Sequence, residues 1–281
     1  LMRSMISFSN GKLEAHPGKL YRPFFSSYSD ELIGKVSQYK SVDIAAAAQK
    51  HLENILCEIV TYCCDLEKIS NTSLALAGGV FANVKANQAL KKLPMINGVF
   101  VQPQMGDGGL CVGAAAKAQH ESGIKIKPLH SLYLGPRIDP NNVINDKPHY
   151  PEFNFTKFDD ITNDICESLS NNLVVGLIRG RMEFGPRALG NRSIIYKTSD
   201  TSVNDWLNKR MKRNDFMPFA PMITIENAAV SFKNFDPNDV TLRFMTATVD
   251  CTEKFKLACP AVTHVDGTAR PQIVTEKSDY F

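Results

Sequence analysis

The chain has 281 residues, of which 43% are hydrophobic and 22% are charged, and its formal net charge is +3. This length is sufficient for two domains with separate cores. The near balance of charge argues against a general nucleic-acid-binding protein. No apolar run reaches the length of a membrane span, and no charged-then-apolar leader opens the chain. We therefore expect neither a nucleic-acid partner nor a membrane.

The cysteine spacing indicates neither a zinc site nor a disulfide framework. We expect reduced, mostly buried thiols in a cytoplasmic protein. The first residue is Leu1 rather than methionine, which suggests a piece of a longer sequence. The seven cysteines are Cys57, Cys63, Cys64, Cys111, Cys166, Cys251 and Cys259.

The first half of the chain predicts alternating helices and strands after an irregular start at residues 1–40. Apolar residues recur at helical spacing from Ser41 to Lys68 and predict a long helix. Strands are expected at 73–77 and 98–102, and helices at 82–92 and 110–121. Strand, glycine loop and helix thus follow one another twice, which predicts an α/β layer with ligand loops at the carboxyl ends of its strands.

The second half begins after a polar connection, residues 125–146, that contains three prolines. We place the domain boundary within it and predict domains at 1–130 and 131–281. Helices are expected at 161–170 and 202–212, and strands at 173–178, 193–196, 219–225, 243–249 and 261–265.

Two glycine loops are candidate ligand sites. Gly78 and Gly79 stand at a strand-to-helix turn, where backbone N–H groups suit a phosphate or a sugar hydroxyl and Asn83 can add a bond. A simple tight turn is the alternative. Gly106 and Asp107 open a Gly-Asp-Gly-Gly loop that can present a carboxylate to a metal or nucleotide. An Asx turn or a helix N-cap is the alternative for Asp107.

The segment after the strand at 173–178 is the strongest local signal. Arg179, Arg181, Arg187 and Arg192 alternate with glycines and a proline. From residue 179 to residue 213 there are nine Lys and Arg against three acids, a net +6. Arginine forks of this kind suit a phosphate or an acyl phosphate, held by charge-assisted bonds. The alternative is a solvated basic surface.

Two further segments can contribute to the same pocket. Lys212 and Arg213 end a helix, where cations can simply complement the helix dipole. The apolar, proline-framed segment 214–221 follows and would aim these cations inward. Near the carboxyl end, His264 and Arg270 alternate with small residues across a turn. His264 can orient a phosphate or move a proton, or it can be a structural hydrogen-bonding residue.

Five segments taken together resemble a known family. They are GGVFAN at 78–83, GDGG at 106–109, GRMEFGPRALGNRS at 180–193, FMPFAP at 216–221 and THVDGTAR at 263–270. They closely resemble, in this order, the O-carbamoyltransferases of the nodulation-protein NodU and antibiotic-tailoring type. The resemblance covers nearly the whole chain, and the arginine motif is highly specific.

The resemblance implies a mixed α/β (α+β) fold. The carboxyl part of an actin/sugar-kinase-like (Kae1-like) domain would be followed by a truncated YrdC-like domain. It also implies an internal fragment that is inactive alone. In the family's chemistry, carbamoyl phosphate and ATP give a carbamoyl adenylate in the second domain. The carbamoyl group then passes to the hydroxyl of a small molecule or sugar, beside iron or another divalent metal ion. A homodimer is left open.

The resemblance also implies roles for individual residues. Asp107 matches the family's metal-ligand aspartate, although the His-x-x-x-His pair that completes that metal site has no counterpart here. Catalytic roles are implied for Arg181, Arg187, Arg192 and His264. Binding of carbamoyl phosphate or nucleotide is expected of Gly78, Gly79, Asn83, Gly106, Arg179, Asn191, Ser193, Lys212, Arg213 and Arg270.

Two other functions remain open. One is a catalytically inactive nucleotide- or anion-binding module within an assembly. The other is a phosphotransferase of the sugar-kinase fold, against which the arginine motif of the second domain speaks.

Overall fold

The computed structural model describes residues 1–18, 20, 28–213 and 219–275. The chain divides into two compact units. Unit 1 comprises Leu1–Leu76 and Asn83–Phe100, and unit 2 comprises Ala77–Ala82 and Val101–Phe281. The chain therefore enters unit 2 first with the short segment 77–82 and later with Val101 and all that follows.

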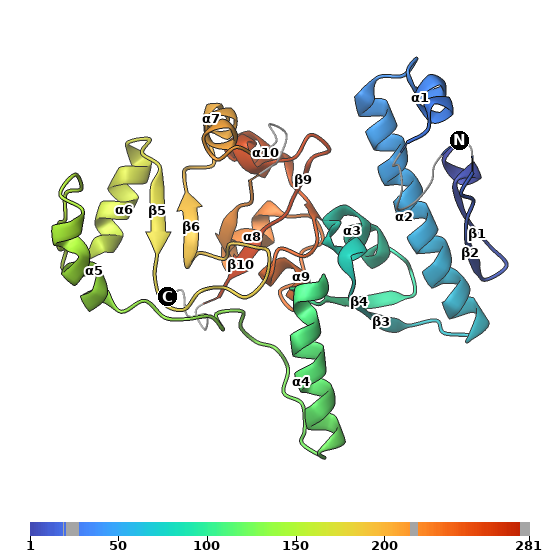
Figure 1. Ribbon diagram of the computed structural model, residues 1–281, viewed down its shortest axis with the longest axis horizontal. Helices are drawn as coiled ribbons and strands as arrows, with labels where there is room; N and C mark the ends of the chain where they lie inside the picture. The colour runs from blue at the N-terminus through green and yellow to red at the C-terminus, as the bar shows by residue number, and fades with distance from the viewer. Residues whose placement is uncertain (19, 21–27, 214–218, 276–281) are drawn as a thin grey trace. The chain divides into compact units, whose positions relative to one another are not determined.

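Unit 1 contains the long helix and most of the first helix–strand alternation (Figure 1). Its elements are η1 (Met2–Ser4), β1 (Ile6–Ser9), β2 (Lys12–Ala15), α1 (Asp30–Val36), α2 (Ser41–Leu66), β3 (Thr72–Leu76), α3 (Val84–Lys91) and β4 (Ile96–Val101), of which Val101 already belongs to unit 2.

The first fifteen residues include a β-hairpin, so the expectation of an irregular segment at 1–40 is wrong. β1 and β2 pair antiparallel, with Ser9 opposite Lys12. Asn10 and Gly11 have φ of 49° and 75°, as a tight two-residue hairpin turn requires, and Asn-Gly is the strongest short signal for such a turn. The sequence pattern around this turn is weak, because the strands have only four residues each and their side chains do not alternate clearly.

Helix α2 confirms the long predicted helix and packs against α3. Ile55 of α2 and Leu90 of α3 are buried. Helix α3 begins where the Asn83 side chain accepts a hydrogen bond from the N–H of Ala86 at 3.0 Å. An asparagine at the N-cap supplies an acceptor for a backbone N–H of the first turn, which has no partner within the helix.

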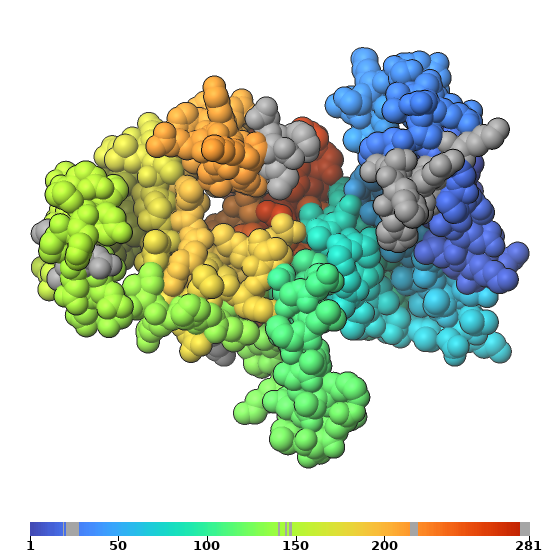
Figure 2. All heavy atoms as spheres, in the orientation of Figure 1, coloured from blue at the N-terminus to red at the C-terminus, as the bar shows by residue number. Residues whose placement is uncertain are grey.

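Unit 2 contains the remaining elements. They are η2 (Gly79–Ala82), η3 (Asp107–Gly109), α4 (Leu110–Glu121), α5 (Pro140–Asp146), η4 (Lys147–His149), α6 (Ile161–Ser170), β5 (Val175–Ile178), β6 (Arg192–Ile195), α7 (Ser202–Arg210), β7 (Met222–Thr224), α8 (Ile225–Ser231), α9 (Val240–Arg243), β8 (Val249–Asp250), α10 (Glu253–Ala258), η5 (Pro260–Val262), β9 (Thr268–Ala269) and β10 (Gln272–Val274). Helix α4 has no buried residue, and Figure 2 shows its side chains exposed on the visible face.

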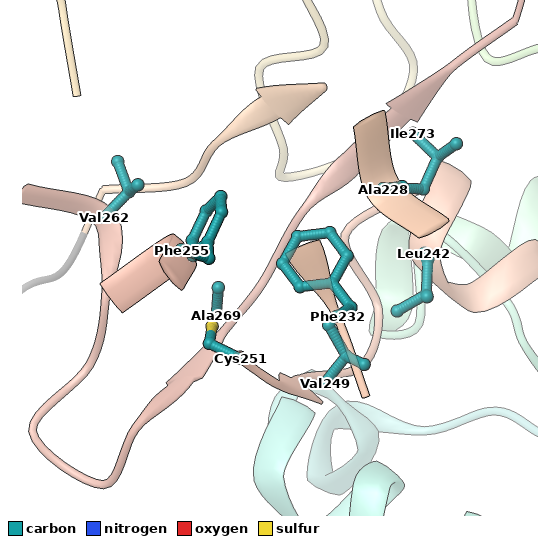
Figure 3. Close-up of a cluster of buried hydrophobic side chains, with 9 residues drawn as sticks. All are labelled: Ala228, Phe232, Leu242, Val249, Cys251, Phe255, Val262, Ala269 and Ile273. Carbon is teal, nitrogen blue, oxygen red and sulfur yellow. The ribbon is translucent and has the colours of Figure 1, made fainter. Parts of the chain in front are cut away.

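The core of unit 2 is a cluster of nine buried side chains drawn from α8 onward (Figure 3). Phe232 and Phe255 lie at its centre with their ring centroids 5.1 Å apart. Ala269 of β9 and Ile273 of β10 belong to the same cluster. The core thus fixes the two short strands on either side of residues 270–271.

Four helices end with the same hydrogen-bonded motif. After each last turn one residue takes a left-handed conformation and the next donates its N–H five residues back, as Arg213 donates to Asn208 at 2.8 Å. This is the Schellman pattern, which satisfies carbonyls that a helix end leaves free. The left-handed residues are Lys68, Gly123, Asn172 and Lys212.

Two predicted strands are wrong. Residues 243–249 instead contain the end of α9 and only the first residue of β8, because Asp239 caps a helix by accepting from the N–H of Thr241 at 2.9 Å. Residues 261–265 include the 3₁₀ turn η5, which Pro260 opens. Short apolar runs cannot be assigned to strand or helix by periodicity alone.

The sheets of the described residues are all two-stranded. β5 pairs antiparallel with β6, whereas β7 pairs in parallel with β10. The predicted mixed α/β class is confirmed. The predicted boundary at residue 130 stays a prediction.

Candidate functional site

The arginine-rich segment is the loop that joins β5 to β6. Ile178 lies opposite Arg192 in the strand pair, so the two ends of the loop are held together. The N–H of Arg179 extends this pairing by donating to the carbonyl of Asn191 at 3.1 Å. Gly185 has a φ of 114°, which favours glycine, at the point where the loop turns. An added Cβ would make only an ordinary contact, 3.4 Å from the carbonyl oxygen of Pro103, so the left-handed backbone and not the space favours glycine here.

Glu183 holds the interior of this loop. Its buried carboxylate oxygen Oε1 accepts the N–H groups of Leu189, Asn191 and Arg192 at 2.8, 2.7 and 3.1 Å. Burial alone would raise the pKa of the Glu183 carboxyl, but the backbone donors outweigh it and the pKa is lowered. A single ionised carboxylate thus fixes the second half of the loop.

Four arginines line one cleft of about 720 Å³, which we call the arginine cleft. They are Arg187, Arg192, Arg213 and Arg270. None of the described residues that line the cleft is acidic. Of the four arginines predicted to converge after β5, Arg187 and Arg192 share this cleft with the later cations Arg213 and Arg270, whereas Arg179 and Arg181 do not.

Local structure explains how Arg213 and Arg270 reach the cleft. Arg213 follows the left-handed residue that ends α7, and its guanidinium carbon lies 5.1 Å from the ring centroid of Phe219. A cation over an aromatic face is attracted by the ring quadrupole. Arg270 follows β9 directly and precedes the fully buried Pro271. Both positions are therefore set by backbone that the fold fixes.

The arginine cleft concentrates positive charge, and no acidic side chain belongs to its described lining. Burial, followed by repulsion from Arg187 and Arg213, lowers the pKa of the Arg270 guanidinium to about 10. Burial also lowers the pKa of Arg187. The Nε atoms of Arg187 and Arg270 are buried, and neither has a hydrogen-bond partner among the described residues. Buried donors of this kind are rare unless a ligand or water completes them.

Arg192 differs from the other three, because backbone carbonyls already occupy its guanidinium. Its Nη1 donates to the carbonyls of Arg179 and Asn191, each at 2.6 Å, and its Nη2 lies 3.4 Å from that of Gly180. These bonds lie across the base of the loop. Arg192 therefore both lines the cleft and ties the loop together.

Arg181 is exposed and lies outside the lining of the arginine cleft. Its Nε and Nη2 donate to the carbonyls of Gly135 and Leu134 at 3.0 and 2.9 Å. The structure therefore does not bring Arg181 together with the cleft arginines. Arg179 also stays outside the lining, and its carbonyl accepts from Arg192.

The other predicted residues of this loop make structural contacts. Asn191 is buried, and its Nδ2 donates to the carbonyl of Arg181 at 2.8 Å. The Ser193 hydroxyl accepts the N–H of Gly190 at 2.9 Å and lines the cleft. Lys212 is exposed, absent from the lining, and contributes its left-handed backbone to the end of α7. Residues 214–218 of the proline-framed segment lie outside the described residues.

His264 lies in a compact turn next to the strand that leads to Arg270. Its Nδ1 is 3.2 Å from the hydroxyl of Thr268, and that hydroxyl donates to the carboxylate of Asp266 at 2.6 Å. His264 is not among the residues that line the arginine cleft. These contacts favour the structural interpretation of this histidine.

The Gly78 turn belongs to unit 2, whereas Asn83 belongs to unit 1. The N–H of Gly78 donates to the carbonyl of Met105 at 2.7 Å. Besides capping α3, the amide of Asn83 exchanges two hydrogen bonds with that of Gln49, at 2.7 and 3.1 Å. The side chain of Asn83 is thus engaged within its own unit.

Asp107 is exposed in η3 and caps no helix, since the N-cap positions of η3 and α4 belong to Gly106 and Gly109. Across the described ranges, no three His, Cys, Asp or Glu side chains gather closely enough to hold a metal ion. A lone carboxylate is a poor metal site. The described residues therefore do not by themselves fit the metal centre that the resemblance implies, and the metal role of Asp107 stays a prediction.

Sequence reasoning left out two residues that matter to the site. Gln272 lines the cleft and donates from Nε2 to the carbonyl of Leu189 at 2.9 Å. Glu183 was noted only as an acid within the basic segment. Its position amid glycines and arginines was the available signal, because a lone carboxylate there can accept the backbone N–H groups of a tight loop.

Two protein-family models match this chain. A model of the carbamoyltransferase N-terminus matches residues 16–116, and a model of the carbamoyltransferase C-terminus matches residues 166–281. The chain belongs to the carbamoyltransferase family. The C-terminal match of this carbamoyltransferase chain contains every arginine of the cleft. The N-terminal match contains both glycine loops.

Curated relatives confirm the resemblance to nodulation proteins. The chain is 32% identical over 238 residues to nodulation protein NolNO of Sinorhizobium fredii, which covers 83% of this chain and 35% of that protein. It is 34% identical over 247 residues to nodulation protein NolO of Bradyrhizobium diazoefficiens, with 84% and 44% covered. It is 30% identical over 239 residues to nodulation protein U of Azorhizobium caulinodans, with 84% and 40% covered. The carbamoyltransferase chain thus spans less than half the length of these relatives.

Within the part of the chain that the structure describes, no helix combines the length and apolar character that a membrane crossing needs.

Proposed function

We propose that this protein transfers a carbamoyl group, and that the arginine cleft binds the anionic carbamoyl donor. The observation that supports this most strongly is the convergence of Arg187, Arg213 and Arg270 on a cleft whose described lining contains no acidic residue. Family membership supplies the reaction class. The positive charge of the arginine cleft is the reason for placing the donor there.

A phosphate group in the arginine cleft would offset two unfavourable features, namely the repulsion among the guanidiniums and the buried Nε donors without partners in the described part of the chain. Its negative charge would offset the repulsion that lowers the pKa of Arg270. Its oxygens would accept from the buried Nε groups of Arg187 and Arg270. Charge-assisted bonds to phosphate are shorter and stronger than neutral hydrogen bonds. We therefore propose carbamoyl phosphate as the donor.

The size of the arginine cleft supports a ligand larger than carbamoyl phosphate. A volume of about 720 Å³ lies within the range of pockets for drug-sized ligands. Part of the lining is apolar and can contact an uncharged portion of the ligand; it includes Ile178, Ile195, Met211, Phe219, Met222 and Met245. We propose that ATP enters the reaction and that an ATP-derived carbamoyl adenylate delivers the carbamoyl group to a hydroxyl of a small-molecule or sugar acceptor.

The contacts divide the arginines by role. Arg187, Arg213 and Arg270 would bind the anion and stabilise the negative charge that develops on the departing phosphate. Arg192 and Glu183 would hold the loop that carries Arg187. We propose a positioning role for Arg181 as well, since its guanidinium is bonded to backbone carbonyls outside the cleft.

All seven cysteines are free thiols, which supports the proposal of a reducing, cytoplasmic location. Only Cys64 and Cys251 are buried, so the expectation of mostly buried thiols is wrong. The binding of a divalent metal in the whole protein remains a proposal that rests on the family alone.

The test is ATP–pyrophosphate exchange that depends on carbamoyl phosphate, since formation of an adenylate from ATP releases pyrophosphate. The wild type, Arg270→Gln and Arg210→Gln are compared. Arg210 is an exposed residue of α7 outside the cleft lining and serves as the matched control. The three proteins are measured as the whole protein, because the resemblance implies that this part of it is inactive alone. We expect exchange in the wild type and the control, and at least tenfold less in Arg270→Gln. Equal exchange in all three would exclude the cleft as the donor site. Anion binding without any exchange would favour a binding module.

A further inference from the structure

The side chain of Arg187 joins two segments. One is the loop between β5 and β6, which we call the arginine loop, and the other is the turn that contains Gly78 and Gly79. Nη2 of Arg187 donates a hydrogen bond to the carbonyl oxygen of Ala82 at 3.2 Å, although the two residues are 105 positions apart in the sequence. Ala82 ends the segment 77–82, which we call the glycine turn and which belongs to the same unit as the arginine loop. Arg187 also lines the arginine cleft. One guanidinium therefore faces both predicted ligand sites.

Further hydrogen bonds hold the glycine turn, including one from the N–H of Phe81 to the carbonyl of Gly78 at 3.0 Å. Besides the bond from Arg187, the N–H of Gly78 donates to the carbonyl of Met105 at 2.7 Å. An added Cβ at Gly78 or Gly79 would meet nothing within 4 Å, so the backbone there is open on that side. The bond from Arg187 therefore joins the carboxyl end of this turn to the loop between β5 and β6.

We propose that Arg187, besides binding the anion, couples anion binding in the arginine cleft to the order of the glycine turn. This inference rests on the proposed function of the cleft. A guanidinium has five N–H donors in a fixed fork, so Arg187 can hold an anion and the Ala82 carbonyl at the same time. The buried Nε of Arg187, which has no partner among the described residues, is a donor left for the anion.

The direction of the coupling follows from the charges. Without an anion, the guanidiniums of Arg187, Arg213 and Arg270 repel one another, as the lowered pKa of Arg270 records. This repulsion favours displacement of Arg187 from the cleft and thereby weakens its bond to Ala82. A bound phosphate replaces the repulsion between the guanidiniums by attraction of each to the anion, and it immobilises Arg187. The bond to Ala82 then forms at a lower cost in side-chain entropy. By linkage, an ordered glycine turn also raises the affinity of the cleft for the anion.

The coupling is measured by amide hydrogen exchange in peptides that cover residues 77–82, with and without inorganic phosphate. In the wild type, saturating phosphate slows exchange in the glycine turn. The slowing reaches at most about 100-fold at a phosphate concentration 100 times the Kd, if opening of the turn requires release of the anion. Peptides of α4 serve as an internal reference, because this helix has no buried residue and no part in the cleft.

Two variants separate coupling from binding. Arg187→Lys keeps a positive charge but lacks the fork that reaches two partners. At saturating phosphate it loses the protection of the glycine turn, although Arg213 and Arg270 still bind the anion. Arg270→Gln binds phosphate more weakly and leaves Arg187 in place, so its glycine turn is still protected once phosphate is saturating.

Calorimetric titration of the same samples makes the outcomes distinct. Absence of phosphate binding in the wild type would overturn the proposed function of the cleft and the coupling with it. Phosphate binding that leaves exchange at 77–82 unchanged would overturn the coupling alone. Protection that persists in Arg187→Lys would show that another residue carries it and would equally overturn the assignment.

Discussion

Removing one charge from the arginine cleft should stabilise the unliganded protein. Arg270→Met keeps a long apolar side chain among buried neighbours and deletes the guanidinium. The lowering of the Arg270 pKa to about 10 corresponds to about 3 kcal/mol of unfavourable free energy for the charged form, at ~1.4 kcal/mol per pKa unit. Because lost packing offsets part of the gain, we expect a net increase of about 1–3 kcal/mol in the free energy of unfolding.

The assay is equilibrium urea unfolding in a buffer free of phosphate and other polyvalent anions. Arg210→Met, on the exposed face of α7, should change stability by less than about 0.5 kcal/mol. The pH dependence provides a second readout. The pKa of Arg270 is lowered in the folded state, so above pH 10 the unfolded state binds more protons and the wild type gains stability as the pH rises. The difference in free energy of unfolding between the wild type and Arg270→Met is therefore largest at pH 7 and decreases above pH 10.

An Arg270→Met variant that is less stable than the wild type at pH 7 would refute this reasoning. That result would mean that the guanidinium has favourable partners and that the arginine cleft is not electrostatically frustrated. Added inorganic phosphate should stabilise the wild type and have a smaller effect on the variant.

Further predictions concern the loops and thiols of the same chain. Glu183→Gln should destabilise the protein by about 1–3 kcal/mol, because three backbone N–H groups lose an ionised acceptor, and limited proteolysis should then cut the arginine loop faster. Gly109→Ala should cost more than about 2 kcal/mol in urea unfolding, since its Cβ would lie only 2.0 Å from the carbonyl oxygen of Gln104. Gly113→Ala, in the exposed helix α4 with nothing within 4 Å of the new Cβ, should instead stabilise by roughly 0.5–1 kcal/mol. Burial raises the pKa of the Cys251 thiol to about 11, so mass spectrometry after iodoacetamide treatment at pH 8 should find Cys251 unmodified while the exposed cysteines react.

Helix positions could be predicted where composition marks the ends. Helices α4 and α6 have the predicted bounds, and each is followed by a residue that readily takes a left-handed conformation, Gly123 or Asn172. Helices α2 and α7 are each two residues shorter than predicted. In both, a lysine takes the left-handed position, at Lys68 and Lys212. Lysine is a good helix former, so the sequence gives no sign that the chain turns there.

The presence of a cationic site could be predicted, but not the use of each arginine. Arg181 and Arg192 look like Arg187 in the sequence, yet their guanidiniums bond to backbone carbonyls. The partners of Arg181 come from Leu134 and Gly135, more than forty residues earlier. Which carbonyls lie within reach depends on tertiary packing that periodicity and spacing do not encode. The composition of residues 179–213 likewise shows their net charge but not the burial that lowers the pKa of Arg187.

Calorimetric titration of carbamoyl phosphate tests most directly whether the arginine cleft holds the anionic donor. The wild type is compared with Arg187→Ala, Arg213→Gln and the control Arg210→Gln. The cleft assignment predicts that both cleft variants lose at least tenfold in affinity, which is about 1.4 kcal/mol, and that the control binds like the wild type. Equal affinity in all four proteins would contradict it.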